Sequence, residues 1–193
     1  MDQSRCLWPL LVAPAGAKIL AVAGTPLFEA TVVIPLYNKG AEINRCLRSV
    51  FELTPTESAP APEVVVVDDG STDGGLSHIA KSYLDRICTC RISNQGPATA
   101  RNTGAAHSRT PWLIFLDADD VLLPGALAEY ARLAANFPEA SVLCAAHLKQ
   151  DADGALIRPR GARQSDFRNY IRDFPWEYTF NRGLINSSSV AIH

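Results

Sequence analysis

From residue 31 onward, short apolar runs alternate with segments whose apolar residues recur at helical spacing. A run that is apolar at every position suits a strand buried on both faces, whereas apolar residues at i, i+3, i+4 and i+7 form one face of a helix. Strands are therefore predicted at residues 31–36, 64–67, 86–92, 112–116 and 141–146. This alternation is typical of an α/β protein, and we expect a Rossmann-like, three-layer αβα fold with a mostly parallel sheet.

Four helices are predicted between these strands. Apolar residues repeat at helical spacing in three of them: Ile43, Cys46, Leu47, Val50 and Phe51 in the first, Leu76, Ile79, Ala80, Tyr83 and Leu84 in the second, and Leu127, Tyr130, Ala131 and Ala134 in the fourth. We expect Thr72 or Asp73 to cap the second helix, Pro97 to open the third and Pro124 to start the fourth. Beyond Arg158 the periodicity fades, and only a short helix near residues 166–172 is expected.

Length and composition indicate one soluble globular domain. The chain has 193 residues, of which 47% are apolar, and a formal net charge of −2, so a broad cationic surface for binding nucleic acid is not expected. The apolar stretch at the start of the chain is interrupted by prolines and is too short to span a membrane. We interpret residues 1–26 as an irregular extension and residues 27–193 as the domain, with its five scattered cysteines in a reducing, cytoplasmic compartment.

Four polar segments each follow directly after a predicted strand: Tyr37-Asn38-Lys39, Asp68-Asp69-Gly70-Ser71, Asn94-Gln95-Gly96 and Asp117-Ala118-Asp119-Asp120. Each alone is explained as an ordinary turn or helix cap. The loops at the carboxyl ends of parallel strands share one edge of the sheet, however, so the four segments are expected to meet. Up to five carboxylates gathered there would repel one another unless a cation binds among them.

An Asp-x-Asp pair after a buried strand suits a hard divalent ion such as Mg²⁺ or Mn²⁺, which takes oxygen ligands and leaves positions for phosphate oxygens. The first turn of the third helix and Arg101 offer further groups for an anion, although Arg101 is equally explained as a solubilising surface residue. The pattern calls for a metal-bridged, anionic ligand such as a diphosphate. Residues 151–154 resemble the start of a calcium loop, but Ala162 stands where its glutamate is needed, so a hairpin turn is predicted.

The same segments, in this order, resemble the motifs of family 2 glycosyltransferases, which have the A-type nucleotide-diphospho-sugar transferase fold. The matching segments are residues 32–39, 64–74, 94–104 and 115–120, and the resemblance covers residues 28–148 well and 149–193 loosely. It implies that Tyr37 packs against the nucleotide base and that Asp69 forms a hydrogen bond to the base, supported by Asp68. It further implies that Asp117 contacts the ribose.

For the diphosphate, the resemblance implies that Asp119 binds the Mn²⁺ or Mg²⁺ ion that bridges it and that Asp120 orients the loop. Asn94 and Arg101 are then expected near the nucleotide and its diphosphate. The implied activity is inverting, metal-dependent transfer of a sugar from a nucleoside-diphosphate sugar, by default a UDP-sugar, to a hydroxyl of a glycan or lipid-linked acceptor. Cell-surface polysaccharide synthesis is the expected setting, and peripheral attachment to the inner face of the membrane stays open.

The resemblance leaves the catalytic base unassigned. Family members place this carboxylate in an acidic segment well after the metal motif, whereas Glu177 is the one acidic residue after Asp173 in this chain. We therefore expect the base beyond His193 and interpret the chain as a fragment of a longer transferase.

Two other function classes remain open at this point. The segment from Asp117 to Val121 also matches the Asp-x-Asp motif of haloacid-dehalogenase-like phosphatases, although that motif normally follows the first strand of its domain. The missing base also suits a non-catalytic module that binds nucleotide sugars. Hydrolysis of p-nitrophenyl phosphate would indicate the phosphatase. Binding of a nucleotide sugar without sugar turnover, even in a protein extended downstream of His193, would indicate the module.

Overall fold

In the computed structural model, residues 27–144, 149–150, 156–157 and 190–193 are described. They form a six-stranded sheet with the order β3-β2-β1-β4-β8-β5. Its strands are β1 (Ala30–Leu36), β2 (Glu63–Asp69), β3 (Cys88–Ile92), β4 (Trp112–Phe115), β5 (Val142–Cys144) and β8 (Val190–Ile192). The first four pair in parallel, and β8 lies antiparallel between β4 and β5. The predicted α/β fold with a mostly parallel sheet is confirmed.

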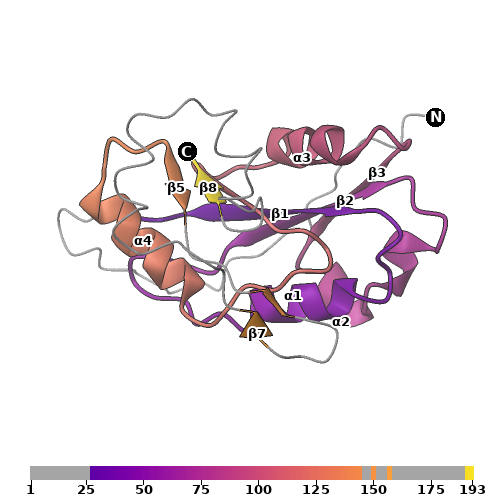
Figure 1. The fold of residues 1–193 in the computed structure, drawn as a ribbon, viewed down its shortest axis with the longest axis horizontal. Helices are drawn as coiled ribbons and strands as arrows, with labels where there is room; N and C mark the ends of the chain where they lie inside the picture. Colours follow the sequence, from indigo (N-terminus) through magenta and orange to yellow (C-terminus); the bar gives the residue numbers. More distant parts are fainter. Residues whose placement is uncertain (1–26, 145–148, 151–155, 158–189) are drawn as a thin grey trace.

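Helices cover both faces of this sheet (Figure 1). Helix α3 (Pro97–Ala106) lies on one face, where a small core cluster contains Val65, Val67, Cys88, Cys90 and Ala100. Helices α1 (Ile43–Phe51) and α4 (Ala126–Asn136) pack on the other face within the larger core cluster, and the short α2 (Lys81–Leu84) lies on the same side. The predicted three layers are therefore present. None of the helices in the described part of the chain is long and apolar enough to cross a membrane.

The prediction of the second helix as one continuous element is wrong. The 3₁₀ helix η1 (Gly75–His78) ends before α2 begins, and Ile79 and Ala80 between them are extended. The Asn44 side chain explains the break, because its amide donates to the His78 carbonyl (2.7 Å) while its oxygen accepts from the Ala80 N–H (2.9 Å). The predicted caps are also corrected: the N-cap residue of η1 is Gly74, although Asp73 accepts a hydrogen bond from the Gly75 N–H.

The remaining elements agree with the sequence patterns apart from their ends. Pro97 is at the start of α3 as predicted, and α4 begins two residues after Pro124 with Gly125 as its N-cap. Strands β6 (Lys149–Gln150) and β7 (Leu156–Ile157) pair antiparallel, as the predicted hairpin requires. The turn between them, the expected helix near 166–172 and the extension 1–26 lie outside the described residues, and the predicted division of the chain at residue 27 stays a prediction.

Small residues let α3 approach the sheet closely. Ala100 and Gly104 are its buried residues, and a Cβ added at Gly104 would lie 2.2 Å from Val33 Cγ1 on β1. Replacing Gly104 by alanine is therefore expected to destabilise the protein by about 1–3 kcal/mol, measured by urea unfolding, because this core has no room for a methyl group. Helix propensity alone favours alanine by about 1 kcal/mol. A Gly104→Ala protein as stable as the wild type would contradict this packing, and Ala106→Gly on the exposed face of α3 serves as the propensity control.

Candidate functional site

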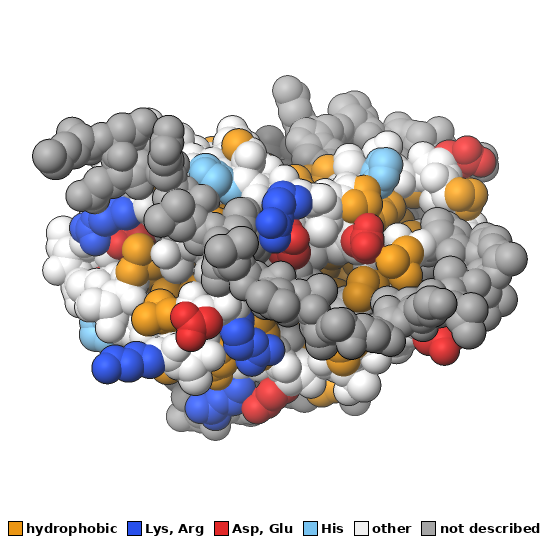
Figure 2. Space-filling model, turned by 180° about the vertical axis from the view of Figure 1, so that it is seen from behind, with side chains coloured by type: hydrophobic (Ala, Val, Ile, Leu, Met, Phe, Trp, Pro, Cys, Tyr) orange, Lys and Arg blue, Asp and Glu red, His pale blue; other side chains and the backbone are white. Residues whose placement is uncertain are grey.

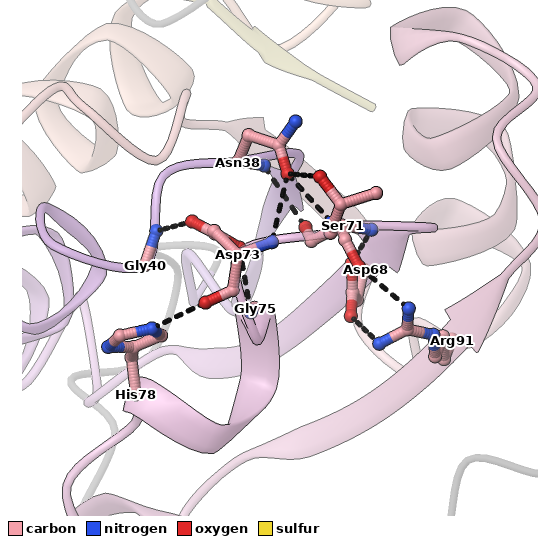
Figure 3. Close-up of polar contacts among 9 residues, drawn as sticks. Asn38, Gly40, Asp68, Ser71, Asp73, Gly75, His78 and Arg91 are labelled. Carbon is pink, nitrogen blue, oxygen red and sulfur yellow. Dashed lines mark hydrogen bonds and ion pairs between the residues drawn. The ribbon is translucent and has the colours of Figure 1, made fainter.

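The loops after β1 and β2 are joined by Asn38 (Figure 3). Its backbone N–H donates to Ser71 Oγ (3.1 Å), and its side-chain oxygen accepts from the backbone N–H groups of Thr72 (2.8 Å) and Asp73 (3.3 Å). Asn38 has a φ of 50°, a left-handed conformation that asparagine tolerates better than most residues. One residue thus makes the sharp exit from β1 and fixes the neighbouring loop.

Asp73 completes the connection between these two loops. One carboxylate oxygen accepts from the Gly40 N–H (2.9 Å) and the other from the Gly75 N–H (2.8 Å). These donors hold the pKa of the Asp73 carboxyl below its ordinary value of 3.8. The His78 ring lies against the same turn through a contact between Nε2 and the Asp73 carbonyl (2.8 Å; Figure 3).

The lowered pKa of Asp73 predicts a pH-dependent contribution to stability. A carboxyl whose pKa falls on folding stabilises the protein fully above its unfolded value, about pH 4, and this stabilisation is lost as the pH falls through the lower, folded value. The difference in melting temperature between the wild type and Asp73→Asn should therefore be constant near neutral pH and shrink below about pH 4. A difference that persists undiminished at pH 2 would contradict the assigned hydrogen bonds.

Asp68, one residue before the end of β2, is fully enclosed by the protein. It accepts from the Ser71 N–H (2.8 Å) and forms an ion pair with Arg91 Nη1 (2.8 Å), while Arg91 Nη2 donates to the Ser71 carbonyl (2.8 Å; Figure 3). The parallel register of β2 and β3 places Asp68 directly beside Arg91. Asp68 therefore shapes the turn, and its side chain has no direct access to solvent.

Asp69 joins the loop after β2 to the loop before α3. It is only 3% exposed, and its two carboxylate oxygens accept from the backbone N–H groups of Gln95 and Gly96, both at 2.8 Å. A Cβ at Gly70 would lie 2.8 Å from the Asn94 backbone nitrogen, so these loops are in close contact. The start of α3 was expected to face an anion, and the structure places the protein's own Asp69 carboxylate beside it.

The loop after β4 is tied to the others through two ion pairs. Asp117 pairs with Arg101 Nη2 of α3 at 2.5 Å, and Asp119 pairs with Lys39 Nζ of the loop after β1 at 2.9 Å. The hydrogen bond from Lys39 holds the pKa of Asp119 below 3.8, and the same bond raises the pKa of Lys39 above 10.5. Together with the contacts above, all four predicted loops meet at one edge of the sheet.

Comparison with known protein families shows the family of the chain. The family model named Glycosyl transferase family 2 matches residues 31–186, more than half of the chain. The chain belongs to this family. The expected resemblance is confirmed, and the fold is that of nucleotide-sugar transferases. The phosphatase alternative loses its support, because Asp117 follows the fourth strand of a glycosyltransferase domain.

Individual relatives match this glycosyltransferase domain over part of their length. The chain is 39% identical to succinoglycan biosynthesis protein ExoU of Rhizobium meliloti over 105 residues, 52% of this chain and 29% of ExoU. Staphylococcus aureus TarS in complex with UDP-GlcNAc superposes with a TM-score of 0.54 and 26% identity, covering 73% of this chain and 38% of TarS. The mannosyltransferase PcManGT of Pyrobaculum calidifontis in complex with GDP-Man and Mn²⁺ gives a TM-score of 0.50 and 29% identity, covering 59% and 34% of the two chains.

The chain spans less than a third of the length of the first curated relatives it matches. Glu177, the one acidic residue after Asp173, lies outside the described residues.

The charge balance at this edge differs from the expected one. We expected up to five carboxylates with little to neutralise them, but Asp68 and Asp119 pair with Arg91 and Lys39, and Asp117 pairs with Arg101. On the face shown in Figure 2, basic side chains likewise lie beside acidic ones in several places. The expectation that repulsion among the aspartates requires a bound cation is therefore wrong. Lys39 and Arg91 were not predicted from the sequence as site residues, although Lys39 belongs to the polar segment Tyr37-Asn38-Lys39.

The residues of this glycosyltransferase site nevertheless fit a divalent ion. No group of three or more His, Cys, Asp and Glu side chains that could hold a metal occurs among the described residues. Mg²⁺ and Mn²⁺ sites that also bind phosphates need only one or two carboxylates, because phosphate oxygens and water complete the shell. The Asp119 side chain, 45% exposed at the edge of the sheet, is a carboxylate that could take part in such a site.

Other predicted contacts are accessible on the same edge. Tyr37, directly after β1, is 45% exposed, and Asn94 is exposed next to Gly70. A separate groove of about 270 Å³ lies between α1 and the segment after Asp120, where Arg45, Val121 and Leu123 are among its walls. That groove contains none of the predicted nucleotide contacts, so the converging loops and not the groove form the candidate site.

Proposed function

We propose that this chain binds the nucleoside-diphosphate part of a sugar donor at the edge where the four loops meet, as the donor site of a metal-dependent, inverting glycosyltransferase. The observation that carries the proposal is the convergence of these loops through Asn38, Asp69, Arg101 and Lys39. In open α/β sheets ligands bind outside the carboxyl ends of the strands, which is where this edge lies.

The nucleoside is held by groups from the first three loops in this proposal. The exposed Tyr37 ring supplies a flat apolar surface for the base. Each Asp69 oxygen accepts one backbone N–H and keeps a second lone pair for a donor on the base edge, and the buried Asp68 fixes the turn that presents it. Asn94 lies beside this turn, where its amide reaches the nucleoside.

The ribose and diphosphate are assigned to the loop after β4 and to α3. Asp117 accepts from a ribose hydroxyl, and Arg101, now paired with Asp117, lies where a guanidinium can donate to phosphate oxygens. Asp119 would hold the divalent ion, and when bound that ion supplies the positive charge that stabilises the leaving nucleoside diphosphate. The carboxylate that takes the proton of the acceptor hydroxyl is not assigned.

Three relatives support the chemical class. TarS is known in complex with UDP-GlcNAc, and PcManGT with GDP-Man and Mn²⁺, so both a nucleotide-sugar donor and a divalent ion are proposed here. ExoU is a succinoglycan biosynthesis protein, which supports a polysaccharide or other cell-surface glycan as the product. The proposed acceptor is accordingly a hydroxyl of a glycan or of a lipid-linked glycan.

Isothermal titration calorimetry of the chain with UDP and with GDP, each in Mn²⁺ or in EDTA, tests the proposal. We expect one diphosphate to bind in Mn²⁺ and this binding to be lost in EDTA. Absence of binding under both conditions would contradict the proposed donor site. Sugar transfer from the preferred donor is then measured with the same protein, and turnover would exclude the non-catalytic module.

A further inference from the structure

The ion pair between Lys39 and Asp119 occupies the carboxylate that the proposed function assigns to the metal. Lys39 Nζ lies 2.9 Å from Asp119 Oδ2, and the two side chains are 44% and 45% exposed. This contact joins the loop after β1 to the loop after β4. It is therefore a direct link between the loop that carries Tyr37 and the loop that carries the proposed metal ligand.

The backbone of each residue of this pair accepts hydrogen bonds, and the Lys39 side chain is 44% exposed. The Lys39 carbonyl accepts from the backbone N–H groups of Glu42 (3.2 Å) and Ile43 (3.1 Å) at the start of α1. The Asp119 carbonyl accepts from Arg45 Nη2 (2.6 Å). The four-carbon lysine stem can then swing its ammonium group without moving either loop.

A divalent ion on Asp119 would compete with Lys39 for the same carboxylate. An ammonium group on Oδ2 and a divalent cation bound to that carboxylate would repel each other, so metal binding weakens the ion pair and the ion pair weakens metal binding. A diphosphate brings negative charges to the same edge and gives the displaced ammonium a new partner. The lysine thus loses one partner and gains another only when nucleotide and metal arrive together.

We propose that Lys39 is a positioning residue. In the free protein its ammonium group occupies Asp119 and competes with the metal for this carboxylate, and when donor and metal bind, the ammonium group moves to the donor diphosphate. The inference rests on the proposed function and adds a reason why the two ligands bind cooperatively. Metal alone must compete with Lys39, whereas metal with nucleotide does not. The ammonium group keeps a negatively charged partner in both states.

Lys39→Met tests both the competition with the metal and the contact with the diphosphate, because methionine keeps about the same side-chain length and removes the charge. Affinity for Mn²⁺ alone, measured from the electron paramagnetic resonance signal of free Mn²⁺, is expected to rise about two- to fivefold, the range for loss of an exposed ion pair. Affinity for UDP at saturating Mn²⁺, measured by calorimetry, is expected to fall by about tenfold, because a charge-assisted hydrogen bond to phosphate is lost.

Lys81→Met on α2 is the matched control, since it makes the same substitution at an exposed lysine outside the four loops and should change neither affinity. Lys39→Arg keeps the charge and should bind UDP within about threefold of the wild type, because guanidinium also pairs with phosphate. Thermal unfolding of each variant establishes that it is folded. If Lys39→Met does not fold, Lys39→Arg still tests whether a positive charge at this position supports UDP binding.

The outcomes distinguish this inference from the proposed function. A wild-type chain that binds neither UDP nor GDP with Mn²⁺ would contradict the proposed donor site itself. A wild-type chain that binds UDP and Mn²⁺ while Lys39→Met leaves both affinities unchanged would overturn only the role of Lys39. A stronger Mn²⁺ affinity with unchanged UDP affinity would also overturn it, because the lysine would then not reach the diphosphate.

Discussion

Replacing Asp119 by alanine is expected to reduce the affinity for UDP in Mn²⁺ by at least about tenfold. The carboxylate stands 45% exposed at the sheet edge and is the proposed protein ligand of the metal, so its removal separates metal from nucleotide. The stability of the variant should stay within about 1 kcal/mol of the wild type, because an exposed ion pair contributes little to folding. Calorimetry and urea unfolding measure the two quantities.

Glu129→Ala is the matched control for this variant. Glu129 forms a comparably exposed ion pair with Arg132 (2.6 Å) on α4, so its loss removes a carboxylate and an ion pair away from the four loops. We expect no change in nucleotide affinity there. Equal affinities of the wild type and Asp119→Ala in Mn²⁺ would contradict the assignment of Asp119 to the metal.

Asp69→Asn is expected to destabilise the protein by about 2–3 kcal/mol and to weaken nucleotide binding in parallel. Both oxygens of the buried Asp69 carboxylate accept backbone N–H groups, from Gln95 and Gly96. An amide side chain of the same size has one acceptor and places its NH₂ group against a second donor. One of the two links between the β2 loop and the start of α3 is therefore lost.

Asp73→Asn makes the same change at an exposed site. Its carboxylate also accepts two backbone N–H groups, from Gly40 and Gly75, but water can replace a lost partner there. We expect a clearly smaller loss of stability than for Asp69→Asn when both are measured by urea unfolding at pH 7. Equal losses in the two variants would show that burial of Asp69 does not decide the effect.

The sequence predicted strands β1 to β5 and three of the helices because their signals are local. Four consecutive valines specify the buried strand β2, and the spacing from Leu127 to Ala134 identifies the buried face of α4. The second helix failed because its pattern is interrupted by a distant group. Asn44 lies 34 positions before His78 in the chain, and no periodicity within residues 76–84 reveals that its side chain binds the backbone there.

The meeting of the four loops was predictable for a general reason, whereas their pairings were not. Parallel strands place their carboxyl ends at one edge, which brings the segments after β1 to β4 together. The partner of each carboxylate depends on the register between strands and on side-chain length. Asp68 meets Arg91 because they are opposite each other in β2 and β3, and Asp119 meets Lys39 across two loops. Reasoning from charge alone left these aspartates unpaired.

The shared binding of one ligand by all four loops is tested most directly by nuclear magnetic resonance. The backbone amide signals of the chain are followed during titration with UDP in the presence of diamagnetic Mg²⁺. We expect chemical-shift changes in residues 37–40, 69–73, 94–96 and 117–120 together, and small changes in residues 108–111 at the opposite edge of the sheet. Changes confined to one loop, or located at the opposite edge, would contradict a nucleoside-diphosphate site at this position.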